Sequence, residues 1–214
     1  MTLHELGREL GGHLPPPGAR VGLLGGSFNP AHDAHLEITL NALKLLDLNE
    51  VWWLVSPQNP LKSSSGMAPL ADRLRSAKRV ARHPRIRVTA MENLLQSRYS
   101  ADTLAFLKRR FPRVRFVWLL GADNLQQLEK WERWQQIFNE SDVAIFDRPS
   151  YSLKALAGKA ARTFSGSRLP ERSAQQLAKG KKPKWVFLHR RLNPLSATEL
   201  RSKTMEGGPD WFNG

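Results

Sequence analysis

The chain has 214 residues, of which 41% are apolar, and a formal net charge of +14. This length suits one domain, and the apolar share is enough for a buried core, which argues against intrinsic disorder. The absence of cysteine excludes disulfides, thiolate metal sites and a thiol nucleophile. No apolar run approaches the ~18 residues that span a bilayer, and the first residues lack a signal-peptide pattern, so we expect a soluble, cytoplasmic protein.

The excess positive charge favours an anionic partner, but it is unevenly distributed along the chain. Residues 1–50 are net negative, and two basic runs supply most of the excess. The first runs from Arg73 to Arg85 with apolar residues interspersed, which predicts a helix with one apolar and one basic face. The second, 179–184, is typical of a loop. No nucleic-acid-binding motif accompanies either run, so we interpret most of these side chains as solvated surface.

The elements expected in chain order alternate between strands and helices. A short helix within 1–14 precedes a Pro-rich break at 15–18. After it come strands at 21–24, 51–55, 86–89, 115–120, 143–146 and 185–188, with helices at 36–46, 70–83, 102–110 and 196–205 and a tryptophan-rich helical stretch after 120. Asp102 and Ser196 are the expected N-caps of their helices. The composition of 150–184 predicts an irregular, mobile insertion.

This alternation predicts a single α/β domain with a doubly wound, Rossmann-like parallel sheet. Such a sheet binds ligands at the carboxyl ends of its strands, near the point where the strand order reverses. We expect an N-terminal extension and linker at 1–18, the domain itself at 19–205 and a C-terminal tail at 206–214.

The segment GGSFNPAHDAH, residues 25–35, follows the first strand directly. Gly25 and Gly26 allow a sharp turn and close approach of a ligand to the backbone. His32 and His35 are three residues apart and share one face of a first helical turn. Glycines, a helix N-terminus and two imidazoles together predict a phosphate-binding cradle.

Other readings of this segment are disfavoured. The sequence contains neither a P-loop motif nor G-x-G-x-x-G, which argues against P-loop kinases and dinucleotide dehydrogenases. A metal site formed by His32, Asp33 and His35 is disfavoured because Asp33 would point away and no third histidine or cysteine is nearby. We therefore expect no metal site built from protein side chains.

The segment resembles the nucleotidyltransferase signature G-G-x-F-x-P-x-H-x-G-H, with Ala34 in place of the last glycine. Ser196, Thr198 and Arg201 resemble the S-x-T-x-x-R box of the same superfamily. From about residue 20 to 205 the chain is most similar to the bacterial nicotinate-nucleotide adenylyltransferase family, including in segments 51–62, 98–104, 118–137 and 147–149. The resemblance implies a sheet of the nucleotidyltransferase type and an enzyme of NAD biosynthesis.

The resemblance also implies which residues bind each substrate. The residues implied for ATP are Gly25, Gly26, Ser27, Phe28, His32, His35, Asp123, Arg148, Ser196, Thr198 and Arg201. Those implied for nicotinate mononucleotide are Gln58, Asn59, Lys62, Tyr99, Ser100 and Trp131. Trp131 suits a pyridinium ring because a flat cation is attracted to an indole face, whereas Trp134 is expected to be structural.

The implied reaction joins ATP and nicotinate mononucleotide, giving nicotinate adenine dinucleotide and pyrophosphate. A phosphate monoester is already mostly dianionic at neutral pH, so no strong general base is needed. The catalytic candidates are the cations and donors His32, His35, Lys62 and Arg201, with Mg2+ held mainly by the ATP phosphates.

Alternatives remain open at this point. Another phosphorylated acceptor, nicotinamide mononucleotide or phosphopantetheine, would keep the same chemistry. A class I tRNA synthetase fragment is disfavoured by the short chain and by the absence of a K-M-S-K-S-like box. A basic RNA-binding protein would need aromatic and basic residues interleaved on one surface, and here they lie in different segments. Whether the chain is a monomer or a homo-oligomer is left undecided by its sequence.

Overall fold

The computed structural model describes residues 1–57, 66–97, 99–148, 151–180 and 182–189. Its centre is a seven-stranded sheet in the order β3-β2-β1-β4-β5-β7-β6, and every pairing between these strands is parallel. The strands are β1 (Arg20–Gly26), β2 (Glu50–Val55), β3 (Ile86–Thr89), β4 (Arg115–Gly121), β5 (Asp142–Phe146), β6 (Arg168–Leu169) and β7 (Trp185–Leu188). The predicted doubly wound parallel sheet is confirmed.

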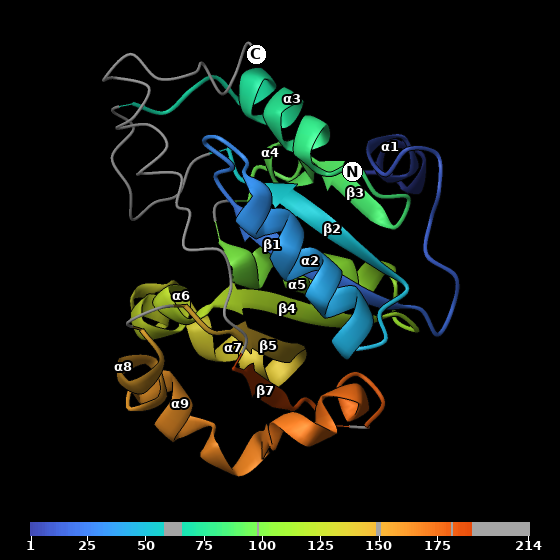
Figure 1. The fold of residues 1–214 in the computed structure, drawn as a ribbon. Helices are drawn as coiled ribbons and strands as arrows, with labels where there is room; N and C mark the ends of the chain where they lie inside the picture. The colour runs from blue at the N-terminus through green and yellow to red at the C-terminus, as the bar shows by residue number, and fades with distance from the viewer. Residues whose placement is uncertain (58–65, 98, 149–150, 181, 190–214) are drawn as a thin grey trace.

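Helices cover both faces of this sheet. The helices are α1 (Leu3–Glu9), α2 (Asp33–Leu45), α3 (Leu70–Val80), α4 (Met91–Leu94), α5 (Ser100–Arg110), α6 (Ala122–Gln127), α7 (Trp134–Glu140), α8 (Ser152–Leu156) and α9 (Lys159–Thr163), with 3-10 turns η1 (Leu128–Lys130), η2 (Ser165–Ser167) and η3 (Glu171–Gln176). In Figure 1, α2 crosses in front of the sheet and α5 lies behind it.

The sheet is buried on both faces because its strands are almost entirely apolar. Successive side chains of a strand point to opposite faces, so β1, β2, β4, β5 and β7 each contribute to two core clusters. Trp52 belongs to the core cluster that also contains residues of α1, α5 and α7, whereas Trp53 belongs to the cluster that contains residues of α2 and α3. Both indoles are fully buried. The strands predicted at 86–89 and 185–188 are confirmed to the residue.

The predicted start of the helix at 102 is wrong. Helix α5 begins at Ser100, and its N-cap is Tyr99 rather than Asp102. Asp102 lies in the first turn of the helix, and its carboxylate forms an ion pair with Arg133 at 2.7 Å. An acidic residue within the first turn is favoured by the helix dipole, so sequence pattern alone did not separate this position from a cap.

The segment expected to be an irregular insertion is more ordered than predicted. Its described part, 151–180, contains α8, α9 and two 3-10 turns, and Ala155 and Ala160 are buried in the core. Strand β6 pairs with β7 and forms one edge of the sheet. A strand of two residues is too short to leave an alternating pattern in the sequence, which is why it was missed.

The N-terminal helix α1 packs onto the same core as the sheet. Leu6 and Leu10 are buried among residues of the core cluster. The carboxylate of Glu9 accepts hydrogen bonds from the Thr89 hydroxyl at 3.1 Å and the Ala90 N–H at 3.2 Å. The extension thus contacts the end of β3. The division of the chain at residues 18 and 205 stays a prediction.

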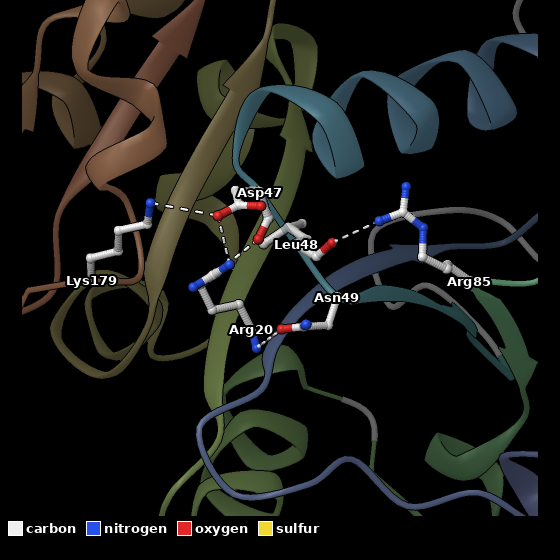
Figure 2. A network of polar contacts seen from close by, with 6 residues as sticks. All are labelled: Arg20, Asp47, Leu48, Asn49, Arg85 and Lys179. Atoms are coloured by element: carbon white, nitrogen blue, oxygen red, sulfur yellow. Dashed lines mark hydrogen bonds and ion pairs between the residues drawn. The ribbon is translucent and has the colours of Figure 1, made fainter.

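Polar contacts fix the turn between α2 and β2, at the edge of the sheet where β1 begins. Figure 2 shows them among Arg20, Asp47, Leu48, Asn49, Arg85 and Lys179. Arg20 donates to the Asp47 carbonyl at 2.8 Å and pairs with its carboxylate at 2.7 Å. Arg85 and Lys179, one from each basic run, also contact this turn. These two cations thus contact the turn rather than standing apart from the rest of the protein. Within the described ranges, no helix is both long and apolar enough to cross a membrane.

Candidate functional site

The candidate site lies where the strand order reverses, between β1 and β4. Both strands end at the same edge of the sheet, β1 at Gly26 and β4 at Gly121. Helix α2 begins beyond the first and α6 directly after the second. Two helix N-termini therefore approach the carboxyl edge at the switch point, the position where α/β sheets bind ligands.

The loop from Ser27 to His32 is held in place by a buried aromatic ring. Phe28 has a φ of +47° and is 1% exposed. Its ring stacks on that of Trp53, with centroids 5.0 Å apart. The Phe28 side chain thus serves as an anchor, which leaves only its backbone to take part in binding the ATP implied by the resemblance.

His32 and His35 lie together at the start of α2, as their spacing predicted. Their ring centroids are 3.9 Å apart. The His32 N–H donates to Nδ1 of His35 at 3.2 Å. His32 is 5% exposed and His35 is half-buried. The imidazoles are therefore held as a pair at a helix N-terminus, where the dipole favours an anion.

Asp123 and Arg148 are brought together from the ends of two neighbouring strands. Asp123 lies in the first turn of α6 after β4, and Arg148 follows β5. Nε of Arg148 is 3.5 Å from the Asp123 carboxylate oxygen Oδ1. Oδ1 is buried and accepts no hydrogen bond from the described residues. A Cβ added to Gly121 would clash with this oxygen, so the glycine provides the room for it.

Two of the three residues implied for the nicotinate ring lie at the N-terminus of α5, and the third follows η1. Tyr99 is its N-cap, and Ser100 is its first residue. Trp131 ends η1 and packs, partly buried, against the core. The Arg133 guanidinium lies over the Tyr99 ring, 5.8 Å from its centroid. Trp134 is buried and makes an edge contact with a neighbouring phenylalanine ring, which confirms its structural role.

A buried carboxyl group supports the turn before α5. The Thr103 hydroxyl donates to Oε1 of Glu92 at 3.1 Å and lies 3.2 Å from the Ser97 hydroxyl, which donates in turn to the Tyr99 carbonyl at 3.0 Å. Burial raises the pKa of Glu92 to about 7, and the hydrogen bond from Thr103 opposes this shift. Glu92, Ser97 and Thr103 were not predicted from the sequence as part of the site.

Arg73, interpreted as one of the cations of a solvated face, is instead buried. It is 1% exposed and donates from Nε to the Ala68 carbonyl at 2.9 Å, from Nη1 to Ser27 and Ser56 at 2.7 Å each, and from Nη2 to Pro57 at 2.9 Å. Burial lowers the pKa of Arg73 from its ordinary value. The described residues place no carboxylate within ion-pair distance of it.

A sequence signal for this burial did exist. Arg73, Ser76, Ala77 and Val80 are spaced as one face of a helix. Ser76 and Ala77 are buried with Arg73, and the Ala31 N–H donates to the Ser76 hydroxyl at 3.2 Å. Two polar side chains three residues apart on the buried face of α3 therefore contact the loop that follows β1.

Several of the implied site residues lie outside the described part of the chain. They are Gln58, Asn59, Lys62, Ser196, Thr198 and Arg201. The described residues bring together the end of β1, the loop after it and the start of α2, and they bring Asp123 to Arg148 at the ends of β4 and β5. The first group is Gly25, Gly26, Ser27, Phe28, His32 and His35. Among the residues that the structure covers, no group of three or more His, Cys, Asp or Glu could hold a metal ion.

Comparison with known proteins agrees with this arrangement. A cytidylyltransferase-like family model matches residues 23–203. A curated protein of Bradyrhizobium sp. strain BTAi1, named "Probable nicotinate-nucleotide adenylyltransferase", is 49% identical over 86% of this chain and 95% of its own. A Cereibacter sphaeroides protein of the same name is 50% identical over 85% of this chain and 96% of its own.

A solved structure shares the fold. It is that of Plasmodium falciparum nicotinic acid mononucleotide adenylyltransferase complexed with NaAD, with a TM-score of 0.62, 17% sequence identity, and coverage of 89% of this chain and 86% of that one. On the family model and the curated relatives, the chain belongs to the nicotinate-nucleotide adenylyltransferase family of cytidylyltransferase-like proteins.

Proposed function

We propose that the chain transfers the adenylyl group of ATP to nicotinate mononucleotide and releases pyrophosphate, forming nicotinate adenine dinucleotide for NAD biosynthesis. The observation that carries the proposal is the 49% identity to a curated relative of that name over 95% of its length. The loop at the switch point supports it, because its geometry suits a polyphosphate.

The triphosphate of ATP would bind over the loop 25–35. Gly25 is exposed and Gly26 half-buried, so the backbone can be approached closely at both positions. His32 and His35 would donate to phosphate oxygens at the N-terminus of α2. For the neutral form of His35, Nδ1 already accepts the His32 N–H, which leaves the ring proton on Nε2.

Asp123 and Arg148 would contribute a second part of the ATP site. The Asp123 carboxylate and the Arg148 guanidinium face each other as an ion pair at the ends of β4 and β5, close to the N-terminus of α6. We propose Ser196, Thr198 and Arg201 for the same substrate, since hydroxyls, N–H groups and a guanidinium can converge on phosphate oxygens.

Nicotinate mononucleotide would bind beside Tyr99, Ser100 and Trp131. The pyridinium is a flat cation, and an indole face attracts it. The phosphate of the acceptor would be met by Gln58, Asn59 and Lys62. These residues follow Pro57, which extends the chain beyond the end of β2 at the same edge of the sheet.

In the proposed mechanism, a phosphate oxygen of nicotinate mononucleotide attacks the α-phosphorus of ATP in line with the leaving pyrophosphate. The principal difficulty is electrostatic, because two polyanions must meet and charge develops on the leaving pyrophosphate. His32, His35, Lys62 and Arg201 would hold and neutralise these groups. Mg2+, bound mainly by the triphosphate, would supply additional positive charge to the phosphate oxygens. We propose no covalent intermediate.

One assay tests the proposal. The purified protein is given ATP and Mg2+ with nicotinate mononucleotide, nicotinamide mononucleotide or phosphopantetheine, and pyrophosphate release is measured. Release with nicotinate mononucleotide at the highest kcat/KM is expected. Preference for another acceptor would overturn the substrate assignment. No release with any acceptor, together with salt-sensitive RNA binding, would favour the RNA-binding alternative. A cytoplasmic location and the domain limits 19–205 stay predictions.

A further inference from the structure

We propose that Arg73 is a positioning residue for the adenylyl-transfer site, setting the orientation of the loop that begins at Ser27 from beneath it. The inference rests on the proposed function, because it gives Arg73 a role at the same site. Arg73 would contact neither substrate. It would act through the backbone that binds ATP.

The guanidinium joins three segments that meet at the carboxyl edge of the sheet. Its acceptors belong to the loop after β1, to the residues directly after β2, and to Ala68 before α3. A planar fork of N–H donors can hold several carbonyls in one fixed geometry, which neither an ammonium nor an apolar side chain can do. Removing the fork would leave buried carbonyl oxygens without a donor.

The contact with Ser27 has a direct consequence for the phosphate-binding side of the loop. A trans peptide is planar, so its carbonyl and the N–H of the next residue point in opposite directions. Because the Ser27 carbonyl points to the guanidinium at 2.7 Å, the Phe28 N–H points away from it. Arg73 thus fixes the direction of a backbone donor in the segment implied to bind ATP.

The charge of Arg73 adds to this effect. Burying a cation costs free energy unless hydrogen bonds or an opposite charge compensate it. Here carbonyl dipoles supply the compensation, and the described residues supply no carboxylate. Because no carboxylate among these residues neutralises it, the net positive charge raises the electrostatic potential at the loop, which favours an anion such as a triphosphate.

Hydrogen bonds of two further side chains, Ser76 and Asn29, hold the same loop from this side. The Ser76 hydroxyl, one turn along α3, accepts the Ala31 N–H. The Asn29 side chain donates to the Gly66 carbonyl at 2.9 Å and accepts the Ala68 N–H at 3.1 Å. The backbone of Ala68 is thus hydrogen-bonded to both side chains, through its carbonyl to Arg73 and through its N–H to Asn29. Helix α3 and the residues before it form the support on which the loop rests.

The test separates the fork from the charge. Arg73→Lys keeps the charge and loses the fork, whereas Arg73→Met loses both. We expect the dissociation constant of a non-hydrolysable ATP analogue, measured by calorimetry on folded protein, to rise about tenfold in Arg73→Lys and about 30-fold or more in Arg73→Met. Millimolar guanidinium should restore part of the binding by Arg73→Met. The matched control is Arg75→Met on the same helix, whose side chain is 65% exposed, and it should bind like the wild type.

Binding by Arg73→Lys within threefold of the wild type would overturn the proposal. If Arg73→Met does not fold, Arg73→Lys decides the question, and failure of both to fold would assign Arg73 to stability alone. A lower Tm with unchanged analogue binding would have the same meaning. Failure of the Arg73 proposal can be distinguished from failure of the proposed function, because binding of the ATP analogue does not depend on the acceptor. Wild-type protein that binds the analogue but does not adenylylate nicotinate mononucleotide would overturn only the proposed function.

Discussion

The backbone N–H of His32 donates a hydrogen bond to Nδ1 of His35 at 3.2 Å, which ties the imidazole of His35 to the main chain at His32 in the candidate phosphate site. The bond orients the ring of His35 at the start of α2 and assigns its neutral-state proton to Nε2. A ring fixed in this way can donate to a phosphate oxygen without first losing orientational freedom, which is the requirement for electrostatic stabilisation of a transition state.

Replacement of His35 by alanine should therefore lower turnover strongly. We expect kcat to fall by about 10² or more, the magnitude that accompanies loss of one positioned donor. Pyrophosphate release at saturating ATP and nicotinate mononucleotide measures it. His13→Ala, at an exposed position outside the site, is the control. A fall of less than threefold would remove His35 from the catalytic set.

Trp131 should determine affinity for the acceptor rather than for ATP. Its indole is only partly buried, so one face can remain available to a pyridinium. We expect Trp131→Ala to raise KM for nicotinate mononucleotide about tenfold, within the range of a partly desolvated cation–π contact, and to change KM for ATP less than twofold. Steady-state kinetics with each substrate varied in turn provides the measurement.

Trp134→Phe is the comparison variant, because Trp134 packs in the core whereas Trp131 is expected to stack on the substrate ring. Trp134 is buried against Phe164, so its replacement should lower Tm and leave both KM values unchanged. If the two tryptophan variants changed KM for the acceptor equally, the assignment of the pyridinium to Trp131 would be wrong.

Most of the sheet could be predicted from sequence, because most of its strands are short apolar runs with helices between them, whereas β6 has only two residues. Val51 to Val55 is buried at every position, and such a run is interpretable without tertiary information. The start of α5 was not predictable in the same way. Its cap is Tyr99, whose carbonyl is held by Ser97, a contact between residues outside any periodic pattern.

Some residues of the candidate site could be predicted from sequence, and Arg73 could not. Gly25, Gly26 and the histidines form one contiguous motif, so sequence alone located them at the end of a strand. Arg73 lies 46 residues from Ser27 along the chain, and its role depends on α3 packing against that loop. Composition assigned it to a basic face because a charged residue is rarely buried. Only the fold shows the carbonyl acceptors that make its burial tolerable.

Glu92 should make the stability of the fold depend on pH. Its pKa is raised from 4.5 in the unfolded chain to about 7 in the folded protein. Between these values the folded state holds a proton that the unfolded state has released, so the free energy of unfolding falls as pH rises, and the contribution is lost above pH 7. The full change is on the order of 3 kcal/mol.

Glu92→Gln isolates this contribution, since its amide oxygen can still accept from Thr103 and the residue does not titrate. Urea unfolding of both proteins from pH 4.5 to 8 should give a flatter profile for the variant. Asp142, whose pKa is also raised by burial, contributes equally to both proteins and cancels in the difference. Glu129→Gln, at an exposed position, should retain the wild-type slope. Parallel profiles for Glu92→Gln and wild type would contradict the assignment.

Gly121 should be needed for the Asp123 carboxylate rather than for the backbone. Its φ of −77° is accessible to alanine, so Gly121→Ala introduces no strain of the main chain. Its Cβ would clash with Oδ1 of Asp123 and lie 3.3 Å from Nε of Arg148. We expect the carboxylate to move, and kcat/KM for ATP to fall about tenfold, as when one polar contact is lost. Gly166→Ala, where a Cβ would meet nothing within 4 Å, should leave kinetics unchanged.

A double-mutant cycle tests whether Gly121 acts through Asp123. If the effect is the clash with the carboxylate, Gly121→Ala should cost little in a protein that already carries Asp123→Ala, because alanine has no oxygen at that position. The two substitutions should then be strongly non-additive, as expected for neighbours that share one interaction. Kinetics with ATP varied, on all four proteins, measures the coupling. Additive losses would show that Gly121 acts on the site by a route other than Asp123.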